Sequence, residues 1–197
     1  YRPAMRRPDI DAMTGRHVMW DGEGDVTVGV PTSGGENVRV PVIRGIVRCV
    51  DDPDRILLQR RAGPQETVRG KVEIPGGRWR AAESPGDAIE REVREETGVE
   101  LVAIHGVRLD VLDSRRTIAS VEPLVVVAGV SGAFPAIHVV LIADGRGTPR
   151  DQPGETLDAR WWRRSEILSA IEVDPSGFIP STLAALSAYE AWLAGSR

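Results

Sequence analysis

The chain has 197 residues, of which 41% are hydrophobic and 27% charged, and its formal net charge at pH 7 is −4. This composition allows a hydrophobic core, while it excludes a membrane-spanning helix, because no run of about 18 apolar residues occurs. The negative balance excludes a general attraction for nucleic acid. The single cysteine, Cys49, excludes an internal disulfide. Because no apolar signal-peptide stretch occurs near residue 1 either, we expect a cytoplasmic protein that binds no membrane.

In chain order, residues 17–30 predict a hairpin around a turn at 21–24. The rest of the chain combines short apolar strands with three helices. Strands are expected at 38–50, 55–60, 101–112, 121–130, 137–143 and 158–162, helices at 84–97, 165–171 and 181–194, and loops at 62–72 and 144–155. Because strands outnumber helices, and the helices lie in the middle and at the end, the pattern indicates a mixed-sheet α/β or α+β domain.

No internal repeat or clear linker divides the chain. We therefore expect an N-terminal extension at 1–38, a main domain at 39–175 and a C-terminal helix at 176–197. Apolar residues of that last helix recur at helical spacing, which predicts that it packs on the domain or on a second copy of the chain. The stripe consists of Leu183, Leu186, Tyr189, Trp192 and Leu193.

Positive charge is concentrated between residues 39 and 80. This segment holds ten basic and five acidic side chains, although the chain as a whole is acidic. The arginines of this segment either lie solvated along strand edges or hold a small polyanionic ligand. The sequence alone is compatible with both interpretations.

One predicted helix carries four glutamates within seven residues, between a capping serine at Ser84 and a terminating glycine at Gly98. At about 100° per residue, Glu92, Glu95 and Glu96 fall within an arc of roughly 100°. They lie beside the apolar stripe of the helix rather than opposite it. Carboxylates this close repel one another unless they share a hard divalent cation. The pattern therefore predicts a metal-binding helix face.

The segment from Gly77 to Val99 has a specific spacing. It reads Gly, five residues, Glu, seven residues, and then Arg-Glu-apolar-x-Glu-Glu-x-Gly-apolar, so that all nine fixed positions of the Nudix box are met. The chain therefore resembles the Nudix hydrolase family. The stretches RILLQRR, VEIPGGR and ARWWRRSEI are more loosely similar to the family's flanking elements. The resemblance implies an α/β fold, the Nudix-type α/β/α sandwich with a mixed β-sheet and a loop-helix-loop metal site.

The resemblance also implies roles for single residues. Glu92, Glu95 and Glu96 match the positions that usually coordinate Mg²⁺ or Mn²⁺, and Glu83 matches the first box glutamate, which often acts through a ligand or a water. Arg91 matches the arginine that usually orients a box carboxylate. A metal ion neutralises the charge of a diphosphate, and a carboxylate takes the proton of the attacking water. Catalysis is accordingly expected from Glu92, Glu95, Glu96 and Arg91.

Substrate contacts are expected around the box. Arg60, Arg61 and Arg78 carry guanidinium groups that can hold phosphate oxygens bidentately. Gly77 lets the loop backbone approach a ligand closely, and Trp79 either stacks on a base or packs on the loop. Three residues are candidates for a further acid outside the box, namely Glu122, Glu155 and Asp158, and each of them fits a plain surface residue as well.

The implied function is that of a metal-dependent pyrophosphohydrolase. Its small-molecule substrate would be a nucleoside diphosphate linked to another moiety, of the nucleotide sugar, ADP-ribose or nucleoside triphosphate type. Two alternatives stay open, a Nudix module that binds its ligand as a sensor without turnover, and an isomerase of an isoprenyl diphosphate. The N-terminal extension is similar to segments that swap between subunits in dimeric family members, which favours a homodimer. The sequence leaves the substrate and the catalytic base open.

Overall fold

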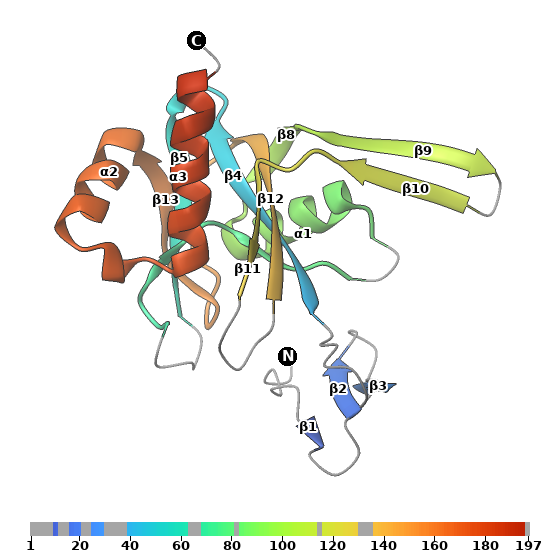
Figure 1. The fold of residues 1–197 in the computed structure, drawn as a ribbon. Helices are drawn as coiled ribbons and strands as arrows, with labels where there is room; N and C mark the ends of the chain where they lie inside the picture. The colour runs from blue at the N-terminus through green and yellow to red at the C-terminus, as the bar shows by residue number, and fades with distance from the viewer. Residues whose placement is uncertain are drawn as a thin grey trace.

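The computed structural model describes residues 10–11, 16–20, 25–29, 39–62, 68–80, 83–113, 116–129 and 136–195 (Figure 1). The strands are β1 (Ile10–Asp11), β2 (Arg16–Trp20), β3 (Asp25–Gly29), β4 (Val40–Cys49), β5 (Asp52–Arg61), β6 (Val72–Glu73), β7 (Gly76–Arg78), β8 (Glu100–Ile104), β9 (Val107–Asp113), β10 (Arg116–Val121), β11 (Val125–Ala128), β12 (Ala136–Arg146) and β13 (Thr156–Arg163). The helices are α1 (Pro85–Thr97), α2 (Arg164–Val173) and α3 (Pro180–Gly195), with a 3-10 turn, η1 (Pro175–Gly177), before α3. The first three strands form a small antiparallel sheet in the order β1-β2-β3.

The central sheet mixes parallel and antiparallel strands in the order β11-β12-β4-β5-β13. β4 and β12 run parallel, with Ile43 opposite Val139, while the other neighbours in this order are antiparallel. Three short strands extend the sheet: β6 pairs with β5, β7 with β4 and β8 with β12. β4 therefore lies at the centre of the sheet, and the short strand β7 is attached directly to it.

Alternate side chains of the central strands build one core on each face of the sheet. The core that joins the sheet to α1 consists of Ile43, Val47, Leu57, Ala88, Ile89, Val93, Val99, Leu141 and Ala143. The core that joins the sheet to α2 and α3 includes Ile46, Ile56, Leu58, Val140, Ile142, Ile167, Ala185, Leu186 and Tyr189. Helices thus cover both faces of a mixed sheet (Figure 1), which confirms the predicted α/β/α fold.

The predicted β region 101–112 is divided into two strands. β8 ends at Ile104 and β9 begins at Val107, and a turn separates them. Gly106 in this turn has a φ of 75°, and a Cβ there would lie 2.3 Å from the Glu122 carbonyl oxygen. Glycine is required for both reasons. The turn moves the chain out of the central sheet, because β8 pairs with β12 whereas β9 pairs with β10.

The C-terminal helix packs on its own domain. Leu186 and Tyr189 are buried, and Leu183 and Leu193 pack against the same core. Trp192 stacks on Tyr189 and stays 40% exposed. The apolar stripe of α3 therefore covers the sheet face opposite α1. Within the residues that the structure describes, no helix is both long and apolar enough to cross a membrane.

Candidate functional site

Helix α1 is fixed at both ends by its own residues. Ser84 is the N-cap: its hydroxyl accepts a hydrogen bond from Asp87 N–H at 3.1 Å, and the Asp87 carboxylate accepts one from Ser84 N–H at 3.3 Å. Gly98 ends the helix with a φ of 70°, and its N–H donates to the Arg94 carbonyl. Because Ile89 is fully buried against the sheet, the rotation of the helix is set, and so are the directions of its glutamates.

The loop before α1 approaches the helix closely because it contains two glycines. Gly76 has a φ of 140°, and a Cβ there would lie 2.3 Å from the Ile43 carbonyl oxygen. A Cβ on Gly77 would lie 2.5 Å from the carboxyl carbon of Glu92. The pairing of β7 with β4 prevents the loop from moving away. The backbone at Gly77 and the Glu92 carboxylate therefore occupy adjacent space, which a side chain at this position would have to share.

Arg91 is the centre of the charged group on α1. Its Nε and Nη2 donate to the two carboxylate oxygens of Glu83 at 2.6 and 2.9 Å, and its Nη1 donates to Glu92 at 2.5 Å. Nη1 also lies 3.5 Å from a Glu95 oxygen, and Nη2 donates to the Arg78 carbonyl at 3.1 Å. The hydrogen bonds from Arg91 lower the pKa of Glu83. One guanidinium thus contacts three box carboxylates and the backbone of β7.

Glu92 and Glu96 lie in surroundings that disfavour their charged forms. Desolvation raises the pKa of Glu96 to about 8, and the charges of Glu73 and Glu92 add to the effect. Two donors oppose it in part, Gly76 N–H at 2.9 Å and Gln59 Nε2 at 2.8 Å, and both reach Glu96 Oε2. Burial also raises the pKa of Glu92, although the neighbouring guanidinium opposes this shift. A cation among these carboxylates would favour their charged forms.

A buried ion-pair network surrounds Glu73, whose charge acts on Glu96 of the box, and the sequence did not predict it. Glu73 is 1% exposed and accepts hydrogen bonds from Arg44 at 3.2 Å and from Arg61 at 3.4 Å. Arg44 also donates to His138 Nδ1 at 3.3 Å. These residues come from four separate strands, so their contacts follow from the strand order. The signal available in the sequence was a polar side chain inside an apolar stretch, as at Gln59 and Glu73.

The three arginines predicted to bind substrate have different surroundings. Arg61 contacts Glu73 and so belongs to the same ion-pair network. Arg60, the next residue of β5, donates to the Gly70 carbonyl at 2.9 Å and pairs with an aspartate of β13. Burial lowers the pKa of Arg78, whereas the charge of Glu92 raises it. Arg78 therefore lies near the box carboxylate Glu92, and Arg61 contacts Glu73, whose charge acts on Glu96. The contacts of Arg60 are with other parts of the chain.

Trp79 contacts the loop that leads into α1. Its indole Nε1 donates to the Glu83 carbonyl at 2.9 Å, and its ring packs against the core on the α1 face. Arg80 N–H donates to the Glu83 carboxylate at 3.1 Å, which closes the same loop. Of the two interpretations of Trp79, packing on the loop is the one that these contacts favour, since its partly buried indole N–H is already bonded to the loop backbone.

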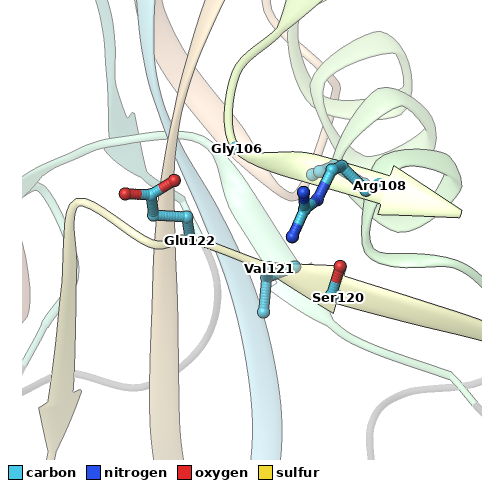
Figure 2. Close-up of a pocket in the computed structure, with 6 residues that line it drawn as sticks. Gly106, Arg108, Ser120, Val121 and Glu122 are labelled. Atoms are coloured by element: carbon cyan, nitrogen blue, oxygen red, sulfur yellow. The ribbon is translucent and has the colours of Figure 1, made fainter.

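The three candidate acids outside the box lie in different places. Glu155 precedes Thr156, whose hydroxyl donates to the Glu96 carbonyl at 3.0 Å. Asp158 pairs with two arginines and has a φ of 51°, which is rare outside glycine. Glu122 lies at the base of the β9–β10 ribbon, beside a cavity of about 320 Å³ (Figure 2). Glu155 is thus the candidate that neighbours the C-terminal end of the box helix.

The donors on α1 suit a hard divalent cation. Glu92, Glu95 and Glu96 offer carboxylate oxygens, which are the ligands that Mg²⁺ and Mn²⁺ prefer. Burial raises the pKa values of Glu92 and Glu96, and the charges of neighbouring carboxylates add to the shifts. In the part of the chain that the structure describes, however, no three His, Cys, Asp or Glu side chains are arranged so that they could hold an ion. Since Arg91 holds Glu83 and Glu92, a bound ion would have to replace part of these contacts.

Comparison with known proteins gave a match to a family model and to several solved structures. A family model described as the NUDIX domain matches residues 40–181. Among solved structures, the chain is similar to a MutT NUDIX hydrolase from Burkholderia pseudomallei, with 22% sequence identity and a TM-score of 0.55. The match covers 77% of this chain and 98% of that chain. A search among curated proteins gave no match.

Two further solved structures have the same fold. The E. coli ORF135 protein, determined in solution, is 20% identical with a TM-score of 0.56, over 80% of this chain and 92% of that chain. The NUDIX domain of Shewanella oneidensis NrtR, crystallised with ADP ribose, is 14% identical with a TM-score of 0.54, over 80% of this chain and 90% of that chain. At these identities the likeness shows a common fold.

Proposed function

The chain belongs to the Nudix family, and on this premise we propose that it is a metal-dependent hydrolase of phosphoanhydride bonds. Its substrate is a nucleoside diphosphate linked to another moiety. One observation carries the proposal: α1 holds Glu92, Glu95 and Glu96 beside Arg91 and against the glycine loop at Gly77. This arrangement concentrates carboxylates where a cation and a diphosphate can meet.

The carboxylates of α1 would hold Mg²⁺ or Mn²⁺. Glu92, Glu95 and Glu96 supply the oxygens, and Glu83 supports them directly or through a water. The bound ion supplies positive charge that offsets the charge of the diphosphate. Arg91 orients Glu83 and Glu92 through the hydrogen bonds described above. One of the α1 carboxylates accepts the proton of the attacking water.

Substrate phosphates are held by the guanidinium groups nearest to the box. Arg61 is favoured by its contact with Glu73, and Arg78 by the electrostatic influence of Glu92 on its guanidinium. Arg60 is a weaker candidate, because it contacts the Gly70 carbonyl. The backbone at Gly77 allows a close approach. The Shewanella NUDIX domain was crystallised with ADP ribose, which supports testing ADP-ribose together with nucleotide sugars and nucleoside triphosphates.

The test is product release from a panel of diphosphates in Mg²⁺ and in Mn²⁺. The panel holds ADP-ribose, nucleotide sugars, dinucleoside polyphosphates, oxidised and ordinary nucleoside triphosphates, and an isoprenyl diphosphate. We expect turnover of one class, lost by about 10²-fold or more in Glu96→Gln and in chelator. Glu90→Gln is the matched control, because Glu90 lies on the exposed side of the same helix and pairs only loosely with Arg94 at 3.9 Å.

The outcomes separate the hydrolase from its alternatives. Tight binding of a panel compound without product would favour a sensor module. A rearranged isoprenyl diphosphate would favour an isomerase. Full activity in Glu96→Gln would contradict the site itself. We expect Glu96→Gln to lose activity and Glu90→Gln to keep it. Of these two residues, only Glu96 belongs to the set of carboxylates that faces the glycine loop.

We further propose a cytoplasmic protein that acts on a small molecule and binds neither nucleic acid nor membrane. The net charge of −4 and the single cysteine support this setting. Cell fractionation checks the location. Binding of the purified protein to labelled RNA at low salt checks the exclusion of nucleic acid, since a genuine contact would be strongest there.

We also propose that the chain forms a homodimer through β9. Val107 and Val121 pack against the core on the α1 face, and the same ribbon face continues outward to Leu109, which is 55% exposed. A two-stranded ribbon is only marginally stable alone. Antiparallel pairing of β9 with its copy about Leu109 would place Arg108 opposite Asp110 twice, so that the edge is complementary to itself in charge.

A further inference from the structure

Gln59 is a polar side chain directly after the apolar run Ile56–Leu58 of β5. It follows Leu57 and Leu58 in β5, and like them it is 0% exposed. The strand alternation directs it to the α1 face of the sheet, where it meets Glu96. Burial of an amide is unfavourable unless its hydrogen bonds are made. The residue therefore needs an explanation that packing alone does not give.

The contact between Gln59 and Glu96 is directed at one oxygen. Gln59 Nε2 donates to Glu96 Oε2 at 2.8 Å, and Gly76 N–H donates to the same oxygen at 2.9 Å. One donor comes from β5 and the other from the glycine loop, so the two fix the plane of the carboxylate. Because both donors use Oε2, the second oxygen, Oε1, is left for a ligand of another kind.

The other end of the same amide is unsatisfied. Gln59 Oε1 is buried and has no hydrogen-bond partner among the residues that the structure describes. An orphaned acceptor of this kind lowers stability. A methionine or leucine of similar volume would avoid this cost, and stability alone would favour either of them over glutamine. We therefore attribute the glutamine at this position to the hydrogen bond that its Nε2 donates to Glu96.

We propose that Gln59 is a positioning residue, which orients Glu96 for the divalent cation of the α1 carboxylates. The inference rests on the proposed metal dependence, and it assigns a task to a residue outside the box. Gln59 acts through Glu96 and does not itself touch the ion. Residues that orient a metal ligand in this way typically contribute 10–100-fold to metal affinity.

The test compares Mn²⁺ binding by wild-type protein, Gln59→Met and Gln59→Leu, using titration calorimetry or the electron paramagnetic resonance signal of free Mn²⁺. We expect both variants to bind Mn²⁺ about 10–100-fold more weakly. In metal-free protein their melting temperatures should equal or exceed that of wild type, because the orphaned acceptor is gone. Gln152→Met is the matched control, since Gln152 is exposed on a loop and should leave Mn²⁺ binding unchanged.

Two results would overturn the inference. Equal Mn²⁺ affinity in wild type and both variants would remove the positioning role. A large loss of stability in the metal-free variants would show that Gln59 serves the fold. Failure of the proposed hydrolase looks different, because Mn²⁺ would still bind in a manner dependent on Gln59 while no diphosphate is cleaved. If wild-type protein binds no Mn²⁺, both the inference and the metal-dependent mechanism fail together.

Discussion

Close approach of a backbone to a carboxylate determines which residue can stand at position 77. A Cβ added to Gly77 would lie 2.5 Å from the carboxyl carbon of Glu92, and 2.5 and 2.7 Å from its two carboxylate oxygens. Glu92 cannot yield freely, because Arg91 holds it and α1 is packed against the sheet. Contacts this short force either the loop or the carboxylate to move.

Gly77→Ala is therefore expected to displace Glu92 and to cost about 1–3 kcal/mol of unfolding free energy. Mn²⁺ affinity and diphosphate hydrolysis should fall with it. Gly86→Ala is the control: Gly86 lies in the first turn of α1, and a Cβ there meets nothing closer than 3.7 Å. That change should be neutral or stabilising by up to about 1 kcal/mol. Urea unfolding measures both, and wild-type stability in Gly77→Ala would contradict the account.

His138 is a second residue with a testable consequence. Burial lowers its pKa to about 4, and the positive charge of Arg44 contributes to the shift. In the unfolded chain the imidazole regains its ordinary pKa, 6.5. Protons then bind the unfolded state more readily, so the cost of folding with a neutral His138 is absent above pH 6.5, grows as the pH falls, and is complete below about pH 4.

The measurement is the urea midpoint of wild type and His138→Gln between pH 7 and pH 4. Glutamine keeps an oxygen that can accept the hydrogen bond from Arg44, while it carries no titratable group. We expect the wild-type midpoint to fall more steeply below pH 6.5 than that of the variant. Parallel curves over this range would show that His138 takes no part in the acid sensitivity of the fold.

Among the elements, α1 carries the carboxylates of the proposed site, and its local sequence sets their directions. Its capping box fixes the first turn, its buried residues fix its rotation, and Gly98 fixes its end. The directions of the acidic side chains then follow from their positions along a helix whose rotation is already set. β5 has a comparable role on the sheet, because Leu57 and Gln59 point toward α1 while Leu58 points toward α3.

Ser84→Ala removes the hydroxyl that accepts from Asp87 N–H, and it should lower the unfolding free energy by about 1 kcal/mol. Ser165→Ala is the matched change at the start of α2, where the exposed Ser165 is not the N-cap. It should stay within about 0.5 kcal/mol of wild type. Denaturant unfolding measures the unfolding free energy of both variants. Equal losses would mean that the capping hydrogen bond of Ser84 does not stabilise the protein.

At the scale of the whole molecule, two helical layers cover the sheet and the β9–β10 ribbon leaves it. The ribbon is a separate sheet that extends from the body (Figure 1). Leu109 and Ile118 are 55% and 50% exposed on it. An exposed strand edge with apolar side chains is a surface that a second chain can cover. The charges at Arg108 and Asp110 make a second copy the occupant that we favour.

Sedimentation equilibrium measures the dissociation constant of the proposed dimer. Arg108→Asp should weaken the dimer by roughly tenfold, because like charges would then face each other at two symmetric places. The double variant Arg108→Asp with Asp110→Arg should restore it. The double variant is the control for the single variant, since both change the same edge of β9. A monomeric wild-type protein, or a double variant as weak as the single one, would rule out this pairing.

The sequence by itself determined the family, the α1 boundaries and the helix face that carries Glu92, Glu95 and Glu96. Helix periodicity and capping are local, so spacing along the chain is enough to predict them. The α/β/α fold was predicted through the resemblance that rests on this spacing, and the two cores confirm it. The substrate, the metal and the site roles stay predictions.

Only the tertiary structure decided which distant residues meet the box. Gln59 and Glu73 reach the site because β5 and β6 pair beside β4, and strand order depends on packing between segments far apart in sequence. Strand alternation in the sequence separates Arg60 from Arg61, yet it does not tell which of the two faces the carboxylates. The break at Gly106, where the carbonyl of Glu122 leaves no room for a side chain, likewise depends on a contact between two strands.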